Sequence, residues 1–216
     1  LKFDAVAPGR VPERLARLLQ GGTAPRPLWV AGSTVGGEEE LVLSAFHRVR
    51  ERVPQARLLV APRHPERFAA VPALVEAAGF RCRRRSALDP AAWGDGEVLL
   101  LDTLGELAQV YALASVVFVG GSLVPAGGHN ILEPAVAGKA VVVGPHMENF
   151  QEIADQFRSE SAMVQVASPD ELAREVSALL LDEERRRGLG DRARGLVGRN
   201  RGAVSRTVDA LSSLLA

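Results

Sequence analysis

The sequence predicts an α/β fold in which helices cover both faces of a doubly wound, Rossmann-like parallel sheet. Short apolar runs alternate with longer amphipathic stretches along the chain. The apolar runs are almost continuously hydrophobic, as expected for parallel strands that are buried on both faces. Because β-α-β crossovers are right-handed, this alternation gives a doubly wound sheet.

The expected strands are short apolar runs that end in turn residues. They lie at 27–32, 56–61, 81–85, 97–101, 115–119, 139–143 and 163–166. The expected helices carry apolar residues at helical spacing, as Val42, Phe46 and Val49 do. They lie at 38–53, 65–78, 104–114, 131–137, 149–157, 169–181, 183–197 and 201–215. Ser168 is placed to cap the helix that follows it, and 88–96 is expected to be a loop.

Length and composition suit one globular domain that spans residues 1–216. A chain of 216 residues, 47% of them hydrophobic and 24% charged, can bury a core and stay soluble. It begins at Leu1 rather than Met, and we expect it to be a piece of a longer protein. No apolar run approaches the roughly 20 residues that cross a bilayer.

Charge and cysteine content argue against several kinds of partner. The chain has 26 basic and 26 acidic residues, so its charge gives no reason to expect a nucleic-acid partner. The arginine-rich run 81–85 is a local excess, which we expect to form a solvated strand edge. The single cysteine, Cys82, cannot form an internal disulfide, which fits a reducing compartment. The four histidines lack ligand spacing, so we expect no metal site and no cofactor.

Glycine and polar residues follow five of the expected strands. The segments are Gly32-Ser33-Thr34, Pro62-Arg63-His64, Asp102-Thr103-Leu104-Gly105-Glu106, Gly120-Gly121-Ser122 and Gly144-Pro145-His146. The opposite ends of the strands carry nothing comparable. Because ligands bind outside the carboxyl ends of the strands in open α/β sheets, this asymmetry predicts a ligand cleft along one edge.

The richest of these loops runs from 120 to 130 and leads into a helix. Its two glycine pairs allow positive φ angles or close approach of a ligand. Pro134 confines the helix start to the neighbourhood of Asn130 and Ile131, since proline is tolerated only in a first turn. The N–H groups and the dipole of a helix N-terminus favour an anion, so we expect a phosphate there.

Several side chains of this loop can add contacts to such a ligand. Ser122, His129 and Asn130 can donate hydrogen bonds, and Glu133 is placed to accept from ribose hydroxyls. A structural interpretation stays open, because Asn130 and Glu133 also have the spacing of a capping box. The dinucleotide fingerprint G-x-G-x-x-G and the P-loop are both absent, so an NAD enzyme is not supported.

The other candidates also have two interpretations each. Arg63 is the best cation for a phosphate, but it could instead pair with Glu66. Asp102 could cap the helix that is expected from 104, or meet the ligand together with Glu106. The acidic triplet 38–40 most simply supports a helix N-terminus, and His146 could face the cleft.

The sequence also resembles the C-terminal domain of bacterial 3-deoxy-D-manno-octulosonic acid (Kdo) transferases. The run from Phe118 to Pro134, FVGGSLVPAGGHNILEP, is highly specific for that family. The other matching segments, which occur in the family's order, are 1–4, 32–34 with 38–40, 62–68, 102–107 and 144–150. The resemblance covers most of the chain up to about residue 157.

The resemblance implies the donor half of a GT-B fold, whose two Rossmann-like domains face each other across a cleft. By this similarity the donor is CMP-Kdo and the acceptor is a lipid A precursor. Contacts with CMP would fall on Pro62, Arg63, Gly105, Glu106, Leu107, Asn130, Ile131, Leu132 and Glu133. Further donor contacts could come from Ser33, Thr34, Gly120, Gly121, Ser122, Gly128, His129 and His146.

The family transfers Kdo with inversion and without a metal, and its general base is a glutamate of the N-terminal acceptor domain. The chain lacks that domain, so we expect no catalytic residue here and no transfer by this chain alone. The parent would work at the cytoplasmic face of the bacterial inner membrane and attach to it through its N-terminal region. Two alternatives remain: a donor domain for a UDP- or GDP-sugar, and a non-catalytic nucleotide-binding module.

Overall fold

The computed structural model describes residues 9–20, 26–87 and 93–214. Its centre is a sheet of seven strands in the order β3-β4-β2-β1-β5-β6-β7, and every neighbouring pair is parallel. The strands are β1 (Leu28–Thr34), β2 (Arg57–Pro62), β3 (Arg81–Arg84), β4 (Glu97–Leu100), β5 (Val116–Val119), β6 (Ala140–Val143) and β7 (Val164–Gln165). The doubly wound parallel sheet that the sequence predicts is confirmed.

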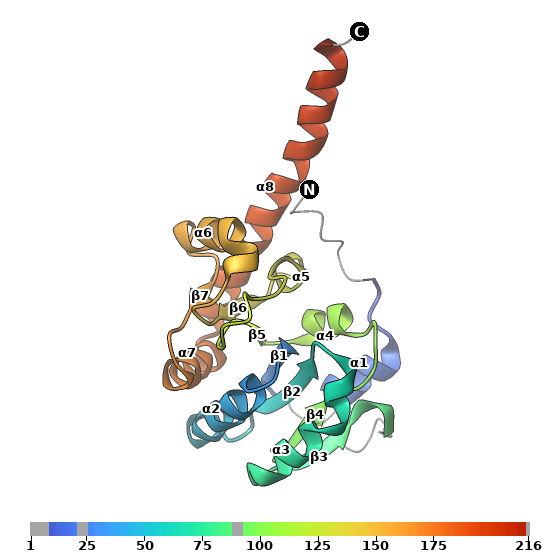
Figure 1. Cartoon of the computed structure of the whole chain (residues 1–216), viewed down its shortest axis with the longest axis vertical. Coiled ribbons are helices and arrows are strands. Elements are labelled where there is room, and N and C mark those ends of the chain that lie inside the picture. The colour runs from blue at the N-terminus through green and yellow to red at the C-terminus, as the bar shows by residue number, and fades with distance from the viewer. Residues whose placement is uncertain (1–8, 21–25, 88–92, 215–216) are drawn as a thin grey trace.

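Helices pack on both faces of the sheet (Figure 1). One face is covered by α1 (Glu13–Gln20), α4 (Leu107–Leu113), α5 (Leu132–Val136), α6 (Gln151–Ser159) and most of the packed part of α8 (Glu183–Leu214). The other face is covered by α2 (Glu38–Arg52), α3 (Val71–Ala77) and α7 (Pro169–Leu181). Three 3-10 helices complete the fold: η1 (Pro65–Ala69), η2 (Arg85–Ala87) and η3 (Glu148–Phe150).

Strand β2 shows why the central strands are apolar throughout. Leu58 and Val60 belong to the core under α2, α3 and α7, whereas Leu59 and Ala61 belong to the core on the opposite face. Successive side chains of a strand point to opposite faces, so a strand covered on both sides needs hydrophobic residues at every position.

The strand order reverses between β1 and β5. From β1 the chain continues outward to β2, whereas β5 lies on the other side of β1 and leads on to β6 and β7. The crevice outside the carboxyl ends of the strands at such a reversal is the usual ligand site of an open α/β sheet. The loops after β1 and β5 border this crevice.

Two expected helices begin or divide differently from the sequence prediction. The single helix expected at 65–78 is wrong: η1 is followed by a separate helix, α3, with Pro72 in its first turn. Proline supplies no backbone N–H, so it suits the start of a new helix and not the continuation of an old one. The helix expected from 104 begins at Leu107, because Gly105 adopts a φ of 82° before it.

The C-terminal region forms one continuous helix, α8, where the sequence predicts two. Gly198 lies within it, since a glycine weakens a helix by about 1 kcal/mol without ending it. Figure 1 shows α8 projecting beyond the α/β body. The structure also contains α1, which the sequence does not predict; Leu15, Leu18 and Leu19 bury its apolar face.

Smaller differences concern the ends of elements. The helix expected at 149–157 starts as η3 and continues as α6, and the strand expected at 163–166 shrinks to β7. The predicted cap is confirmed, since Ser168 Oγ accepts from Glu171 N at 3.2 Å. Residues 1–4 and 88–92 and the side chains of 202–216, which carry parts of the sequence predictions, lie outside the described residues.

Candidate functional site

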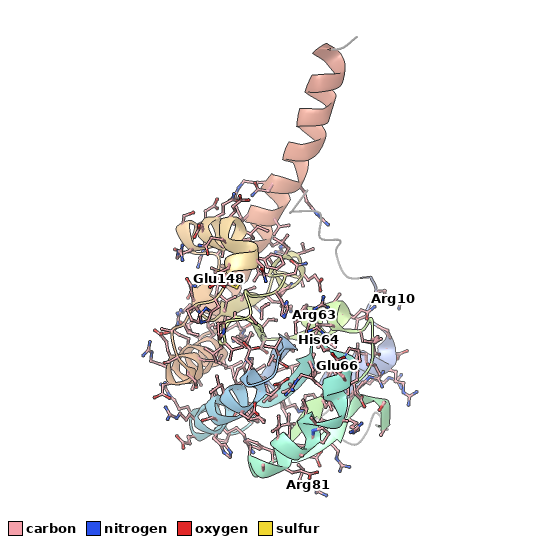
Figure 2. The ribbon with its side chains drawn as sticks, viewed as in Figure 1. Arg10, Arg63, His64, Glu66, Arg81 and Glu148 are labelled. Atoms are coloured by element: carbon pink, nitrogen blue, oxygen red, sulfur yellow. The ribbon has the colours of Figure 1, made fainter. Side chains whose placement is uncertain are left out.

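The loops after β1, β2, β5 and β6 meet at one edge of the sheet, as the sequence predicts. Backbone hydrogen bonds tie them together: Gly120 N donates to Gly32 O at 2.8 Å, and Arg63 N donates to Thr34 O at 2.8 Å. His146 N donates to Ser122 O at 2.9 Å on the far side. Figure 2 labels Arg63 and His64 where β2 ends.

A fully buried carboxylate, Glu38, holds the loop after β5 against the start of α2. Its oxygens accept from the backbone N–H groups of Gly121 at 2.8 Å, Ser122 at 3.1 Å and Leu123 at 2.9 Å. Val35 N donates to it as well, at 3.3 Å. Burial raises the pKa of Glu38 above its ordinary value, against the lowering effect of these four N–H donors. The three loop N–H groups are therefore used inside the protein and do not point at a ligand.

Its neighbour Glu39, also fully buried, holds the segment after β2. Arg67 donates to both of its oxygens, from Nε and from Nη2, each at 3.0 Å. Thr34 Oγ1 adds a hydrogen bond at 3.2 Å, and its side chain is fully buried too. The expected place of 38–40 at a helix N-terminus is confirmed, since all three lie in the first turn of α2. Glu38 and Glu39 in addition connect α2 to strand-end loops.

The glycines of the loop from 120 to 130 are required by its backbone. Gly121, Gly127 and Gly128 have φ angles of 68°, 83° and 74°. A Cβ on Gly120 would lie 2.5 Å from Ser33 O, and one on Gly128 would lie 2.5 Å from Met147 Sδ. These glycines are therefore needed for two reasons: three of them have left-handed backbone angles, and the loop packs closely against its neighbours.

We expect Gly128→Ala to destabilise the protein more than Gly37→Ala. Both positions are left-handed, with φ angles of 74° and 84°, which costs an L-residue roughly 1–2 kcal/mol. A Cβ at Gly37 meets nothing within 4 Å, whereas Gly128 adds the clash with Met147, worth roughly a further 1–3 kcal/mol. Urea unfolding of the two variants measures the difference. Equal losses would mean that the loop tolerates the added methyl group.

Arg63 and His129 lie near each other at the mouth of the site. Among the described residues, the exposed Arg63 side chain has no hydrogen bond or ion pair. The alternative pairing with Glu66 is therefore wrong; Glu66 instead lies 3.8 Å from His64. Burial lowers the pKa of His129, and the charges of Arg63 and His64 lower it further. His129 is therefore neutral at pH 7, and its buried Nε2 has no partner in the described part of the chain.

The loop after β4 presents Gly105 at the surface and fixes Glu106 from two sides. Arg85 Nη2 donates to Glu106 Oε1 at 2.8 Å, and Thr103 Oγ1 donates to Glu106 Oε2. Leu107 is half-buried at the start of α4. The run 81–84 forms the edge strand predicted from the sequence, yet its arginines face carboxylates of the β4 region, as the 2.9 Å contact of Arg83 with Glu97 shows.

Asp102 does not cap a helix. Its carboxylate accepts from Ser86 N at 2.8 Å and from Ser86 Oγ at 2.6 Å. The capping interpretation is wrong because α4 begins five positions later, at Leu107. Asp102 instead anchors η2 beside the end of β4.

The start of α5 is built around Asn130. Asn130 Oδ1 accepts from Leu132 N at 2.9 Å, and Asn130 Nδ2 lies 3.4 Å from Glu133 Oε1. Glu133 thus contacts the side chain of Asn130 and not its backbone N–H, so the capping box is incomplete. Ile131 and Leu132 are buried, and Pro134 lies inside the five-residue helix.

Tyr111, the only tyrosine of the chain, connects this helix with β1. It is fully buried; burial raises its pKa, the charge of Glu133 raises it further, and a hydrogen bond with Ser33 opposes the rise. Ser33 has a φ of 57°, and a Cβ on Gly32 would lie 2.2 Å from the tyrosine Oη. Tyr111 therefore packs closely against the end of β1, where the register with β2 shifts between Gly32 and Thr34.

Ser122 and His146 occupy different environments. Ser122 is fully buried; its hydroxyl donates to Val119 O at 2.5 Å and accepts from Gly144 N at 2.8 Å. That side chain joins the ends of β5 and β6. His146 is half-exposed, and its Nδ1 lies 3.2 Å from Glu148 Oε1.

The sequence does not predict Tyr111 and Arg85 as contributors to this edge, nor the contacts of Glu38 with the loop after β5. Each acts through a partner far along the chain, 83 residues away for Glu38 and Gly121 and 21 residues away for Arg85 and Glu106. The described residues contain no group of three metal-ligating side chains. None of the described helices is long and apolar enough to cross a membrane.

The chain is similar to known glycosyltransferases. A family model described as glycosyl transferases group 1 matches residues 92–196. The 3-deoxy-D-manno-octulosonic acid transferase of Haemophilus influenzae is 40% identical over 167 residues, which make up 77% of this chain and 39% of that protein. The protein of the same name from Bordetella pertussis is 35% identical over 218 residues, 100% of this chain and 50% of that protein. The chain thus spans half or less of the length of these curated relatives.

A solved structure matches at the level of the fold and of the sequence. It is the C-terminal CMP-Kdo binding domain of WaaA from Acinetobacter baumannii, with a TM-score of 0.73 and 35% identity. The match covers 80% of this chain and 89% of that one, which confirms the expected C-terminal half of a GT-B fold. The chain therefore belongs to the 3-deoxy-D-manno-octulosonic acid (Kdo) transferase family and corresponds to the C-terminal domain of its members.

Proposed function

We propose that this chain binds CMP-Kdo as the donor domain of a glycosyltransferase that moves Kdo to a lipid A precursor. The observation that carries the proposal is the exposed guanidinium of Arg63, which pairs with no other described residue. It follows β2, the strand next to the strand-order reversal, and lies beside the neutral His129. A guanidinium binds phosphate in a bidentate manner, and this position is where an open α/β sheet takes its ligand. The solved relative, which binds CMP-Kdo according to its description, supports the identity of the ligand.

In this proposal CMP contacts three segments that follow strands. They are Pro62 and Arg63, then Gly105 to Leu107, and then Asn130 to Glu133. Arg63 holds the phosphate, aided by the N-terminus of α5. Because α5 has only five residues, its dipole is small, so the charge of Arg63 is the larger contribution. Glu133 accepts from ribose hydroxyls, and Ser33, Thr34, Gly120, Gly121, Gly128, His129 and His146 line the rest of the site.

The internal contacts assign different tasks to these candidates. The side chains of Thr34 and Ser122 and the N–H groups of Gly121 and Ser122 are already used inside the protein, so they shape the site. Arg63, exposed and without a partner among the described residues, is the better candidate for direct contact, and His129, whose buried Nε2 has no partner there either, is the second. Glu106, held by Arg85, can meet the nucleoside end of CMP.

We further propose that the transfer inverts the sugar centre and needs no metal. CMP leaves as a phosphate monoester, and a guanidinium at that phosphate stabilises the charge that grows on it. The base that activates the acceptor, the acceptor site and the membrane attachment belong to the N-terminal domain of the parent, at the cytoplasmic face of the bacterial inner membrane. This chain alone then binds the donor without transferring it.

Titration of the chain with CMP, UDP and GDP tests the ligand. We expect CMP to bind more tightly than the other two nucleotides, with backbone amide shifts in NMR at 63, 105–107 and 130–133. A preference for UDP or GDP would replace CMP-Kdo by another nucleotide sugar in the same fold. Binding of none of the three nucleotides would contradict the nucleotide site itself.

Glu133→Ala should weaken CMP binding by about 1.5–3 kcal/mol, which is the range for a hydrogen bond to a charged group. Among the described residues, the carboxylate of Glu133 accepts one hydrogen bond, from Asn130 Nδ2, so the variant should stay folded. Calorimetry with CMP measures the change, and circular dichroism checks the fold. Unchanged affinity in a folded variant would leave Glu133 only its contact with Asn130.

A further inference from the structure

A second concave site lies at the opposite edge of the sheet from the strand-end loops. It has a volume of about 230 Å³ and is formed where β5 and β6 begin and α8 starts. Its lining residues are Ala114, Ser115, Gly138, Lys139, Ala140, Glu183, Arg186 and Arg187. Parallel strands place all their amino ends at one edge, so this pocket is separate from the site around Arg63.

The pocket holds two positive charges that no carboxylate neutralises. Lys139 is half-buried, and among the described residues its ammonium group has no hydrogen bond or ion pair. Burial lowers the pKa of Lys139, and the charge of Arg186 lowers it further. In the part of the chain that the structure describes, the guanidinium of Arg186 donates to carbonyl oxygens at the end of α7, Leu179 O at 2.9 Å and Leu180 O at 3.3 Å, and pairs with no carboxylate.

The remaining pair of charges in the pocket cancels. Arg187 Nη2 lies 2.5 Å from Glu183 Oε1 within the first turns of α8. The net charge contributed by the lining side chains is therefore that of Lys139 and Arg186, two positive charges. A half-buried ammonium group beside a second cation is unfavourable unless an anion compensates it.

The backbone around Lys139 is held rigidly. Gly138 has a φ of 68°, and the backbone N–H of Lys139 donates to Pro134 O at 3.0 Å. Helix α8 packs directly on this turn, since a Cβ on Gly190 would lie 2.1 Å from Gly138 O. The two cations therefore face a preformed pocket, which lowers the entropy cost of binding.

We propose that this pocket binds a small phosphate-type dianion, either a free phosphate compound or the phosphate of an anionic lipid headgroup. Its two uncompensated cations match the charge of such an anion. Its volume falls below the roughly 300–1,000 Å³ of sites for drug-sized ligands, which suits a phosphate group and not a whole nucleotide sugar. The site is independent of the proposed donor site, and each can fail without the other.

The experiment follows the binding of inorganic phosphate through the NMR signals of the lysine side chains. The chain contains two lysines, Lys2 and Lys139, so lysine labelled with carbon-13 at Cε gives two side-chain signals in NMR. We expect phosphate to shift the Lys139 signal in a saturable manner, at constant ionic strength. The backbone amides of 138–140 should move with it, while cytidine, which carries no phosphate, should leave all of them unchanged.

Variants identify the cations that carry the binding. Lys139→Gln should weaken phosphate binding about tenfold or more, because one charge-assisted contact is lost. Binding to this variant is monitored through the NMR signals of the amides of 138 and 140. Arg52→Gln, which removes an exposed cation outside the pocket, should leave the affinity unchanged. Phosphate shifts that persist in a folded Lys139→Gln variant would overturn the proposal, as would the absence of any saturable shift in the original chain.

Vesicles distinguish the two sources of phosphate. Binding to phosphatidylcholine vesicles that contain phosphatidic acid, whose headgroup is a phosphate monoester, assigns the pocket to lipid headgroups if it is lost in Lys139→Gln and competed by inorganic phosphate. Saturable binding of inorganic phosphate without vesicle binding assigns it to free phosphate compounds.

Discussion

Replacing Arg63 by alanine should weaken the binding of CMP by about 1.5–3 kcal/mol, a factor of roughly 10 to 150. The guanidinium is exposed and has no internal partner among the described residues, so its whole effect should be on the ligand. For the same reason the free energy of unfolding without ligand should stay within about 0.5 kcal/mol of the original. A loss of CMP affinity without a loss of folding stability is expected for a residue whose side chain contacts the ligand and no other part of the protein.

Calorimetry with CMP and urea unfolding measure the two quantities side by side. Arg52→Ala, at another exposed arginine, is the matched control and should change neither. Arg63→Lys keeps the charge but loses the bidentate geometry, so its affinity should lie between those of the original and of Arg63→Ala. If Arg63→Ala binds CMP as the original chain does, the phosphate lies elsewhere.

The pKa of His129 should also report the ligand. Arg63 and His64 lower this pKa in the free protein, so a phosphate that neutralises Arg63 should raise it. This shift would connect Arg63, His129 and the ligand in one measurement.

The sequence predicts the sheet well because the signal for each central strand is local. Leu58 to Ala61 place apolar side chains on both faces of the sheet. This unbroken apolar run predicts a buried strand even when its neighbouring strands are not known. The position of the candidate site follows too, since Arg63 and Gly120 follow strands and parallel strands end at one edge. Helix boundaries are less predictable where Pro72 and Gly198 occur, because the outcome depends on packing and not on the residue alone.

The supports of the site are not predictable in this way. Glu38 and Glu39 stand in an acidic triplet at a helix start, where acidic residues are common for a local reason. Their actual partners, Gly121 and Arg67, come from distant parts of the chain and become neighbours only in the folded sheet. A sequence pattern indicates contacts between residues that are near each other along the chain. The contacts of Glu38 and Glu39 join segments that are far apart in the sequence, so no local pattern indicates them.

Glu38→Ala should have the largest effect on stability, a loss of about 3 kcal/mol or more. The carboxylate is fully buried and accepts from the N–H groups of Gly121, Ser122 and Leu123. Removing it leaves these donors buried without acceptors, and each unsatisfied group costs about 1–3 kcal/mol. Glu38→Gln retains one acceptor oxygen but turns an NH₂ group toward backbone donors, so it should be destabilised as well, by less.

Glu40→Ala is the matched control for that experiment, because Glu40 is exposed in the same acidic triplet and should change stability by less than about 0.5 kcal/mol. Hydrogen exchange supplies the second measurement: the amides of 121–123 should lose protection in Glu38→Ala and keep it in Glu40→Ala. Since the same loop leads to His129 and Asn130, CMP affinity should fall together with the protection. If Glu38→Ala keeps both its stability and the protected amides, water or another group satisfies the loop, and the carboxylate does not hold the site in place.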